Sequence, residues 1–248
     1  MALLVTRPQP DNEATAAALR AKGFEVLLAP MLRFEAVAVK DDPQARYGAV
    51  IVTSANALRA VAGQTAIARL LDLPLFAVGA RTAQSARDSG FRNVIVADGD
   101  ASALRDKIVE SARAKQLQKA DALLYLSGAE VARDLAGELR ALGFNIATQT
   151  AYKMVPVHDL PDAVCEAFAA NRIEAVLHYS GRSVRSFLDA ARTAGIEISA
   201  LAVPQCCLSA AVAGVVREAG ATRVMEARSP DEAALFDVLD RALSPPAR

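Results

Sequence analysis

Leu19-Arg-Ala-Lys-Gly-Phe24 recurs 120 residues later as Leu139-Arg-Ala-Leu-Gly-Phe144, and Ala2-Leu-Leu recurs at the same spacing as Ala122-Leu-Leu. Two more pairs of segments match at slightly larger spacings: Gly48–Ser54 with Glu174–Ser180, and Ala77–Ala83 with Cys207–Ala213. A spacing that grows by a few residues is what small loop insertions produce in a duplicated unit. The sequence therefore predicts an internal duplication.

Short apolar runs alternate with alanine-rich stretches along the chain. The predicted strands of the first copy are Ala2–Thr6, Phe24–Ala29, Ala49–Thr53, Leu75–Val78 and Val94–Ala97, and the predicted helices are Asp11–Lys22, Ala55–Ala62 and Thr82–Ser89. Continuous apolar strands joined by helices are typical of a parallel sheet that is covered on both faces. We expect an α/β chain with about five strands in each half, enough for one small doubly wound sheet per half.

Composition excludes several classes of protein. Of the 248 residues, 53% are hydrophobic and 23% charged, and the mean hydropathy is +0.21, which predicts a folded globular chain. Lys and Arg (28) balance Asp and Glu (28), and only 5% of residues are aromatic, so we expect no nucleic-acid partner. No apolar run approaches the roughly 20 residues of a membrane-spanning helix, and the first residues resemble a strand rather than a signal peptide. These patterns predict a cytoplasmic protein without a membrane partner.

Cysteine and histidine usage gives no sign of a metal centre. Cys206 and Cys207 are adjacent in an apolar run, and with Cys165 they are too few for a disulfide framework. His158 and His178 have no metal-ligand spacing with any cysteine or pair of carboxylates. We expect neither a metal nor a cofactor.

Small hydroxyl residues and glycines follow the predicted strands where the next helix begins. They occur in Thr6-Arg7, Thr53-Ser54, Gly79 with Thr82, Ser127-Gly128, Tyr179-Ser180-Gly181 and Leu208-Ser209. A single Ser or Thr at such a position is often only a helix cap. Several helix N-termini at one edge of a sheet attract anions, however, and ligands of parallel sheets bind at this edge. With Arg7, Arg81 and Arg182 nearby, the pattern predicts a polyanionic ligand.

The usual nucleotide and hydrolase motifs are absent. The sequence contains no Gly-x-x-x-x-Gly-Lys, no triple-glycine dinucleotide fingerprint and no Gly-x-Ser-x-Gly elbow. Neither histidine lies near a serine or cysteine in a way that indicates a catalytic triad.

Five motifs, taken in order, resemble the uroporphyrinogen-III synthase family over essentially the whole chain. They are Thr6-Arg7, Thr53-Ser-Ala-Asn56, Ala77-Val-Gly-x-x-Thr-Ala83, Thr150-Ala-Tyr152 and Ser229-Pro-Asp-x-x-Ala-Leu235. The resemblance implies two intertwined, doubly wound, flavodoxin-like parallel-sheet domains. The first strand–helix–strand of each half then completes the sheet built by the later strands of the other half. The implied domains are residues 1–34 with 157–248, and residues 38–151, joined by hinge strands at 31–39 and 151–157.

The same resemblance implies a function in tetrapyrrole and haem biosynthesis. The implied lyase closes hydroxymethylbilane, a linear tetrapyrrole with eight carboxylates, to uroporphyrinogen III, with loss of water and inversion of ring D and without a cofactor. Tyr152 corresponds to a family tyrosine placed to assist the departing hydroxyl, since a tyrosine hydroxyl is protonated at neutral pH. The alternative to a catalytic role is that Tyr152 is an edge tyrosine that only packs in the hinge.

The residues expected to bind substrate come from the motifs and the strand ends. They are Arg7, Thr53, Ser54, Ala55, Asn56, Gly79, Thr82, Ser127, Gly128, Ser180, Gly181 and Ser209. Val212 departs from the threonine of some members, which favours backbone contacts as the main means of binding.

Two other functions remain open from the sequence. A non-catalytic two-lobed protein that closes on a small polyanion also places helix N-termini around a cleft. A flavodoxin-like electron carrier is disfavoured because the strand ends lack aromatic residues to flank a flavin. No long apolar stripe requires a partner chain, so we expect a monomer.

Overall fold

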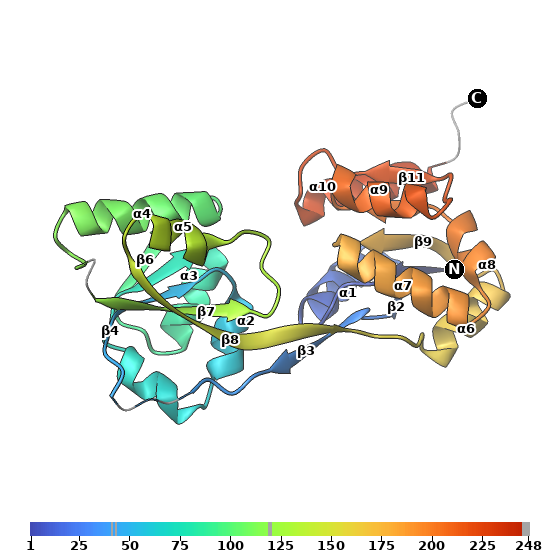
Figure 1. The fold of residues 1–248 in the computed structure, drawn as a ribbon. Coiled ribbons are helices and arrows are strands. Elements are labelled where there is room, and N and C mark those ends of the chain that lie inside the picture. The colour runs from blue at the N-terminus through green and yellow to red at the C-terminus, as the bar shows by residue number, and fades with distance from the viewer. Residues whose placement is uncertain (41, 43, 119–120, 245–248) are drawn as a thin grey trace. The chain divides into compact units, whose positions relative to one another are not determined.

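The structure is a computed structural model that describes residues 1–248 except 41, 43, 119–120 and 245–248. The chain divides into two compact units. Unit 1 comprises Met1–Phe34 and Val155–Arg248, the blue and the yellow-to-red parts of Figure 1, and unit 2 comprises Glu35–Met154. Each unit contains one sheet flanked by helices.

The sheet of unit 1 has five parallel strands. Their order is β11 (Val224–Glu226), β10 (Gln205–Cys207), β9 (Ile173–His178), β1 (Ala2–Val5) and β2 (Glu25–Leu28). The helices of this unit are α1 (Asp11–Ala21), α6 (Asp162–Ala169), α7 (Gly181–Thr193), α8 (Glu197–Ala202), α9 (Ala210–Glu218) and α10 (Glu232–Leu243).

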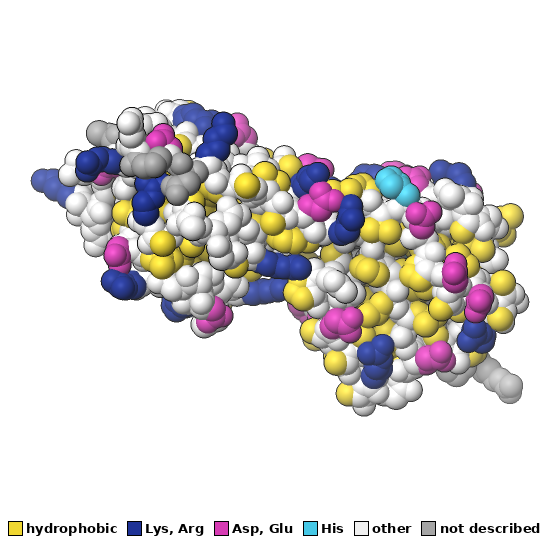
Figure 2. Space-filling model, turned by 90° about the horizontal axis from the view of Figure 1, so that it is seen from below, with side chains coloured by type: hydrophobic (Ala, Val, Ile, Leu, Met, Phe, Trp, Pro, Cys, Tyr) yellow, Lys and Arg dark blue, Asp and Glu magenta, His cyan; other side chains and the backbone are white. Residues whose placement is uncertain are grey.

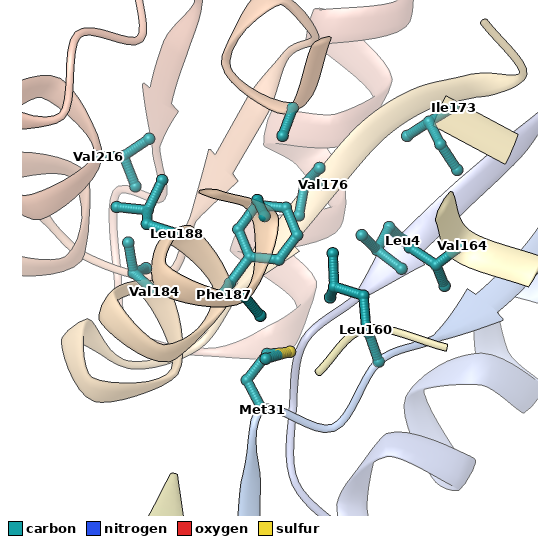
Figure 3. Close-up of a cluster of buried hydrophobic side chains, with 14 of the residues drawn as sticks. Leu4, Met31, Leu160, Val164, Ile173, Val176, Val184, Phe187, Leu188 and Val216 are labelled. Atoms are coloured by element: carbon teal, nitrogen blue, oxygen red, sulfur yellow. The ribbon is translucent and has the colours of Figure 1, made fainter. Parts of the chain in front are cut away.

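Both faces of this sheet are buried, which explains the unbroken apolar strands. Leu4 packs with Met31, Val176 and Phe187 on one face (Figure 3), and Leu3 belongs to a second cluster with α1 and α10 residues on the other. Leu3 and Leu4 are completely buried although they point to opposite faces. Burial of a leucine side chain contributes roughly 2 kcal/mol to stability, so polar residues are disfavoured at every position of β1.

The sheet of unit 2 has six strands. Their order is β3 (Leu32–Ala36), β8 (Asn145–Pro156), β7 (Ala122–Gly128), β4 (Tyr47–Val52), β5 (Leu75–Val78) and β6 (Val94–Ala97), and β8 through β6 pair in parallel. The helices are α2 (Ala55–Val61), α3 (Gly79–Asp88), α4 (Ala101–Arg113) and α5 (Leu135–Ala141), with a 3₁₀ turn η1 (Thr65–Leu70).

The two sheets exchange segments between the halves of the chain. The β1-α1-β2 segment pairs with β9 from the second half, and β7-α5-β8 pairs with β4 from the first half. The order β2-β1-β9-β10-β11 in unit 1 therefore matches the order β8-β7-β4-β5-β6 in unit 2. The predicted class, two intertwined parallel sheets, is confirmed. The internal duplication stays a prediction, with which the matching orders agree.

Two neighbouring strands, β3 and β8, carry the chain between the units (Figure 1). Val37 N donates to Ala151 O at 2.7 Å, and Val157 N donates to Met31 O at 3.1 Å. The partners advance in opposite directions along the two strands, as in an antiparallel pair. Lys153 and Glu35, also opposite each other, form an ion pair of 2.8 Å. The link between the units is therefore a pair of strands, and its action as a hinge stays a prediction.

Most predicted elements lie where the sequence placed them. The predicted strands Leu75–Val78 and Val94–Ala97 coincide with β5 and β6. The helix predicted from Thr82 begins three residues earlier, at Gly79, because this glycine adopts a φ of +72° that lets the chain turn directly from β5 into α3.

No helix among the described residues is long and apolar enough to cross a membrane. The described residues also contain no group of three His, Cys, Asp or Glu side chains that could hold a metal ion. On the face drawn in Figure 2, cationic and anionic side chains are scattered among hydrophobic ones.

Candidate active site

Three of the predicted serines are helix caps. Ser54 Oγ accepts a hydrogen bond from Asn56 N at 3.2 Å at the start of α2, and Ser180 Oγ accepts one from Ser183 N at 3.1 Å at the start of α7. Ser209 does the same for α9 with a longer bond of 3.4 Å to Val212 N. Each cap satisfies one N–H, while the other N–H groups of the first turn have no partner within the helix. The serines thus fix helix ends that point toward the carboxyl edge of their sheets.

The carboxyl edge of the unit 2 sheet gathers most of the predicted residues. Thr53, Ser54, Ala55 and Asn56 lie between β4 and the first turn of α2. Gly79 and the buried Thr82 form the first turn of α3, and the buried Ser127 ends β7 together with Gly128. These residues and Tyr152 belong to unit 2, whereas Arg7, Ser180, Gly181 and Ser209 lie at the carboxyl edge of the unit 1 sheet.

Tyr152 lies in β8 directly beside the end of β7. Tyr152 is the partner of Gly128 in the register of β7 and β8, and Ala129 N donates to Tyr152 O at 2.8 Å. The residue is half-buried, so part of its surface is accessible to solvent or a ligand. The structure therefore gives Tyr152 both a packing role and access to the strand-end edge.

Tyr125 is a second tyrosine at this edge, and the sequence analysis missed it. Its hydroxyl lies 3.2 Å from Thr53 Oγ1, and the residue is only 3% exposed. Burial raises the pKa of Tyr125, the hydrogen bond with Thr53 opposes this rise, and the nearby Tyr152 adds to it. Tyr125 stands in the apolar run Leu-Leu-Tyr-Leu, which is typical of a core strand. Only its place two residues before the strand-end Ser127 indicated a polar environment.

Arg7 is held by partners within unit 1. Its guanidinium contacts Asp11 and Glu232, each at 3.1 Å, and lies 4.6 Å above the ring of Tyr179. Glu232 also accepts hydrogen bonds from Tyr179 and Thr15. Burial raises the pKa of Tyr179 well above its ordinary range, which keeps its proton in this network. Two carboxylates thus offset the charge of Arg7, and the residue ties β1 to α1, α10 and the end of β9.

A pocket of about 350 Å³ lies at the unit 1 edge, beside Ser209. It is lined by the loop after β10 and the loop after β11, including Ala210, Glu226 and Arg228. Glu226 is paired with Arg217 at 3.1 Å, whereas the exposed Arg228 has no ion-pair partner among the described residues. Arg228 is a cation that the sequence analysis did not select, although it directly precedes the Ser229–Leu235 motif.

Comparisons with known proteins agree with this architecture. A family model described as "Uroporphyrinogen-III synthase HemD" matches residues 13–237. A search of curated proteins finds no match. The chain is similar in fold to a uroporphyrinogen-III synthetase from Helicobacter pylori, with 16% identity, a TM-score of 0.67 and coverage of 98% of this chain and 99% of that one.

A mutant uroporphyrinogen III synthase from Thermus thermophilus is similar at 18% identity and a TM-score of 0.54, with the same coverage of both chains. These identities are low, so the two structures support the fold, and the family model supports membership. The residues matched by the family model span most of the sequence and include every strand of the two sheets except β1. The chain belongs to the uroporphyrinogen-III synthase family.

Proposed function

We propose that the chain closes hydroxymethylbilane to uroporphyrinogen III, with loss of water and inversion of ring D. Family membership over residues 13–237 is the observation that carries this proposal. The strand-end edges support it, since each presents capped helix N-termini and small side chains. No observation favours a non-catalytic binding protein or an electron carrier over this reaction.

The substrate's eight carboxylates suit these edges. The N-termini of α3, α7 and α9 each carry positive partial charge, worth roughly 0.3–1 kcal/mol toward a nearby anion. We assign substrate binding to the first turns of these helices and of α2, that is, to Thr53–Asn56, Gly79, Thr82, Ser180, Gly181 and Ser209, with Ser127 and Gly128 beside them. Arg228 extends this set as a candidate cation. Arg7 is held by Asp11 and Glu232, and its main role is to stabilise unit 1.

Tyr152 is the proposed proton donor. The C–O bond of the terminal hydroxymethyl group breaks, and the oxygen leaves as water after taking the phenolic proton. The pyrrole electrons stabilise the resulting azafulvene, which ring D attacks through its substituted carbon. The spiro intermediate fragments and recloses, and the proton lost on closure returns to Tyr152, so the net loss is one water. The protein mainly holds the chain in the conformation that gives inversion.

The direct test supplies hydroxymethylbilane and resolves the porphyrin isomers after oxidation. We expect isomer III with the enzyme and isomer I in its absence, because the free bilane closes without inversion. Isomer I alone in the presence of the folded protein contradicts the proposed function.

Replacement of Tyr152 by Phe removes the proton donor and leaves the ring. We expect kcat to fall roughly 100-fold, in line with the usual contribution of a general acid, while the product remains isomer III. An unchanged kcat removes the role of Tyr152 and leaves the reaction assignment intact.

We further propose that the protein works as a cytoplasmic monomer on a small-molecule substrate. Light scattering during gel filtration checks the oligomeric state, with a mass near 26.1 kDa expected for one chain.

A further inference from the structure

Gly128 lies directly against the reactive end of Tyr152. A Cβ atom built on Gly128 would lie 2.9 Å from Cζ, 3.0 Å from the hydroxyl oxygen and 3.2 Å from Cε2 of Tyr152. A real Cβ atom does not approach a carbon atom this closely. The space that Gly128 leaves open is therefore the space in which the phenol group lies.

The backbone of Gly128 is not what requires a glycine. Gly128 is absent from the glycines with positive φ, so its conformation is open to alanine. The three nearest neighbours of the added Cβ all belong to the ring of Tyr152. A methyl group at this position thus meets the phenol of Tyr152 first.

Backbone hydrogen bonds hold Ala151 and Tyr152, so we expect the flexible ring of Tyr152 to move rather than the backbone. The register of β7 and β8 shifts between Ser127–Thr150 and Gly128–Tyr152, which leaves the buried Ala151 as an extra residue in β8. Such an irregularity redirects a side chain. Ala129 N then holds Tyr152 O at 2.8 Å, and Val37 N holds Ala151 O at 2.7 Å.

We propose that Gly128 is a positioning residue for the hydroxyl of Tyr152. The extra residue in β8 turns the phenol onto β7, and the bare backbone of Gly128 receives it beside the Thr53–Tyr125 pair. The catalytic part of this inference rests on the proposed function. The contact between Gly128 and Tyr152 does not depend on the proposed function. The contact and its catalytic effect are therefore tested by separate measurements.

The contact is tested in Gly128→Ala by NMR of the chain with labelled tyrosine rings. The sequence has four tyrosines, and the Tyr152 resonance is identified by its loss in Tyr152→Phe. We expect Gly128→Ala to shift this resonance. Gly214→Ala is the matched control, because its added Cβ meets no atom within 4 Å and its φ is not positive. An unmoved Tyr152 resonance in Gly128→Ala overturns the proposal, whatever the activity.

The catalytic part is tested by kinetics on hydroxymethylbilane. We expect Gly128→Ala to lower kcat roughly 10-fold to 100-fold, the usual effect of a small misplacement. In the Tyr152→Phe background the same substitution is expected to lower kcat no further, since no hydroxyl remains to be displaced. A multiplicative effect in the double variant, or a shifted resonance with unchanged kcat, rejects the positioning role. An inactive wild-type protein rejects the proposed function instead.

Discussion

His178 shows how one buried side chain makes the stability of this protein depend on pH. Gln205 donates through its amide to Ala200 O at 2.7 Å and Val203 O at 2.9 Å, so its Oε1 faces His178 Nε2 at 2.9 Å. Nε2 must therefore carry the proton of the neutral ring, and Nδ1 faces the hydroxyl of Thr6 at 3.2 Å. The imidazole is a fixed tautomer in the core rather than a catalytic base.

We predict that acid destabilises the protein through His178. Burial lowers the pKa of His178 from 6.5 to about 4. The unfolded chain binds this proton below pH 6.5 and the folded chain does not, so stability is complete above pH 6.5 and declines toward pH 4. The loss amounts to roughly 3 kcal/mol. Urea unfolding between pH 7.5 and 4.5 measures it. We expect the decline in stability to be smaller in His178→Gln and unchanged in His158→Gln, a substitution at an exposed histidine. An equal decline in all three proteins contradicts the prediction.

Arg228 tests whether the unit 1 pocket binds a substrate carboxylate. We predict that Arg228→Gln raises KM roughly threefold to tenfold with kcat unchanged, because an exposed charge-assisted contact is worth little more than 1 kcal/mol. Arg223→Gln is the control, since Arg223 is exposed at the opposite end of β11. Steady-state kinetics distinguishes the two. Equal values of KM for both variants remove Arg228 from the site.

At the scale of elements, the capping serines affect both the stability of the fold and the proposed substrate-binding site. Ser180 closes the N-terminus of α7, a helix of 13 residues whose inner face carries the buried Val184 and Phe187. Loss of the cap leaves an N–H of the first turn without its partner. Capping and ligand binding therefore have to be separated by the choice of substitution.

We predict that Ser180→Ala lowers the free energy of unfolding by about 1 kcal/mol, whereas Ser180→Gly lowers it by only a few tenths. Urea unfolding measures both. If the Ser180 hydroxyl also binds substrate, the two variants share the same rise in KM despite their different stabilities. A KM that follows stability instead assigns the serine to capping alone.

Sequence patterns predicted the elements better than the partners of individual side chains. β5 and β6 were predictable because each is a short apolar run between turn residues. The pairing of Arg7 with Glu232 was not, because the two residues are 225 positions apart and no local pattern joins them. Tyr125 was missed because its apolar neighbours predict a core residue, which it also is. Substrate contact by the selected strand-end residues stays a prediction.

At the scale of the whole molecule, the exchange of segments defines which fragments can fold. Residues 32–156 contain all six strands of the unit 2 sheet. Residues 1–120, the predicted first repeat, contain β1 and β2 without β9, and β4 to β6 without β7. The boundary of the predicted repeat therefore does not coincide with a boundary between the two sheets.

We predict that a fragment of residues 32–156 unfolds cooperatively in urea, and that a fragment of residues 1–120 does not. Circular dichroism and urea titration of both fragments check this. The first fragment retains a complete sheet, whereas the second leaves strand edges and apolar faces uncovered. A cooperative transition in residues 1–120 contradicts the assigned sheet order.

The same exchange sets the order in which the protein matures on the ribosome. Translation delivers β1 and β2 before β3 to β8, and β9, which pairs with β1, emerges after all of them. We expect unit 2 to fold while the nascent chain is still growing, when β1 and β2 still lack β9. Until Ile173–His178 leaves the exit tunnel, the apolar strand Ala2–Val5 exposes an unpaired edge. We expect this edge to be prone to aggregation and to need chaperones during synthesis.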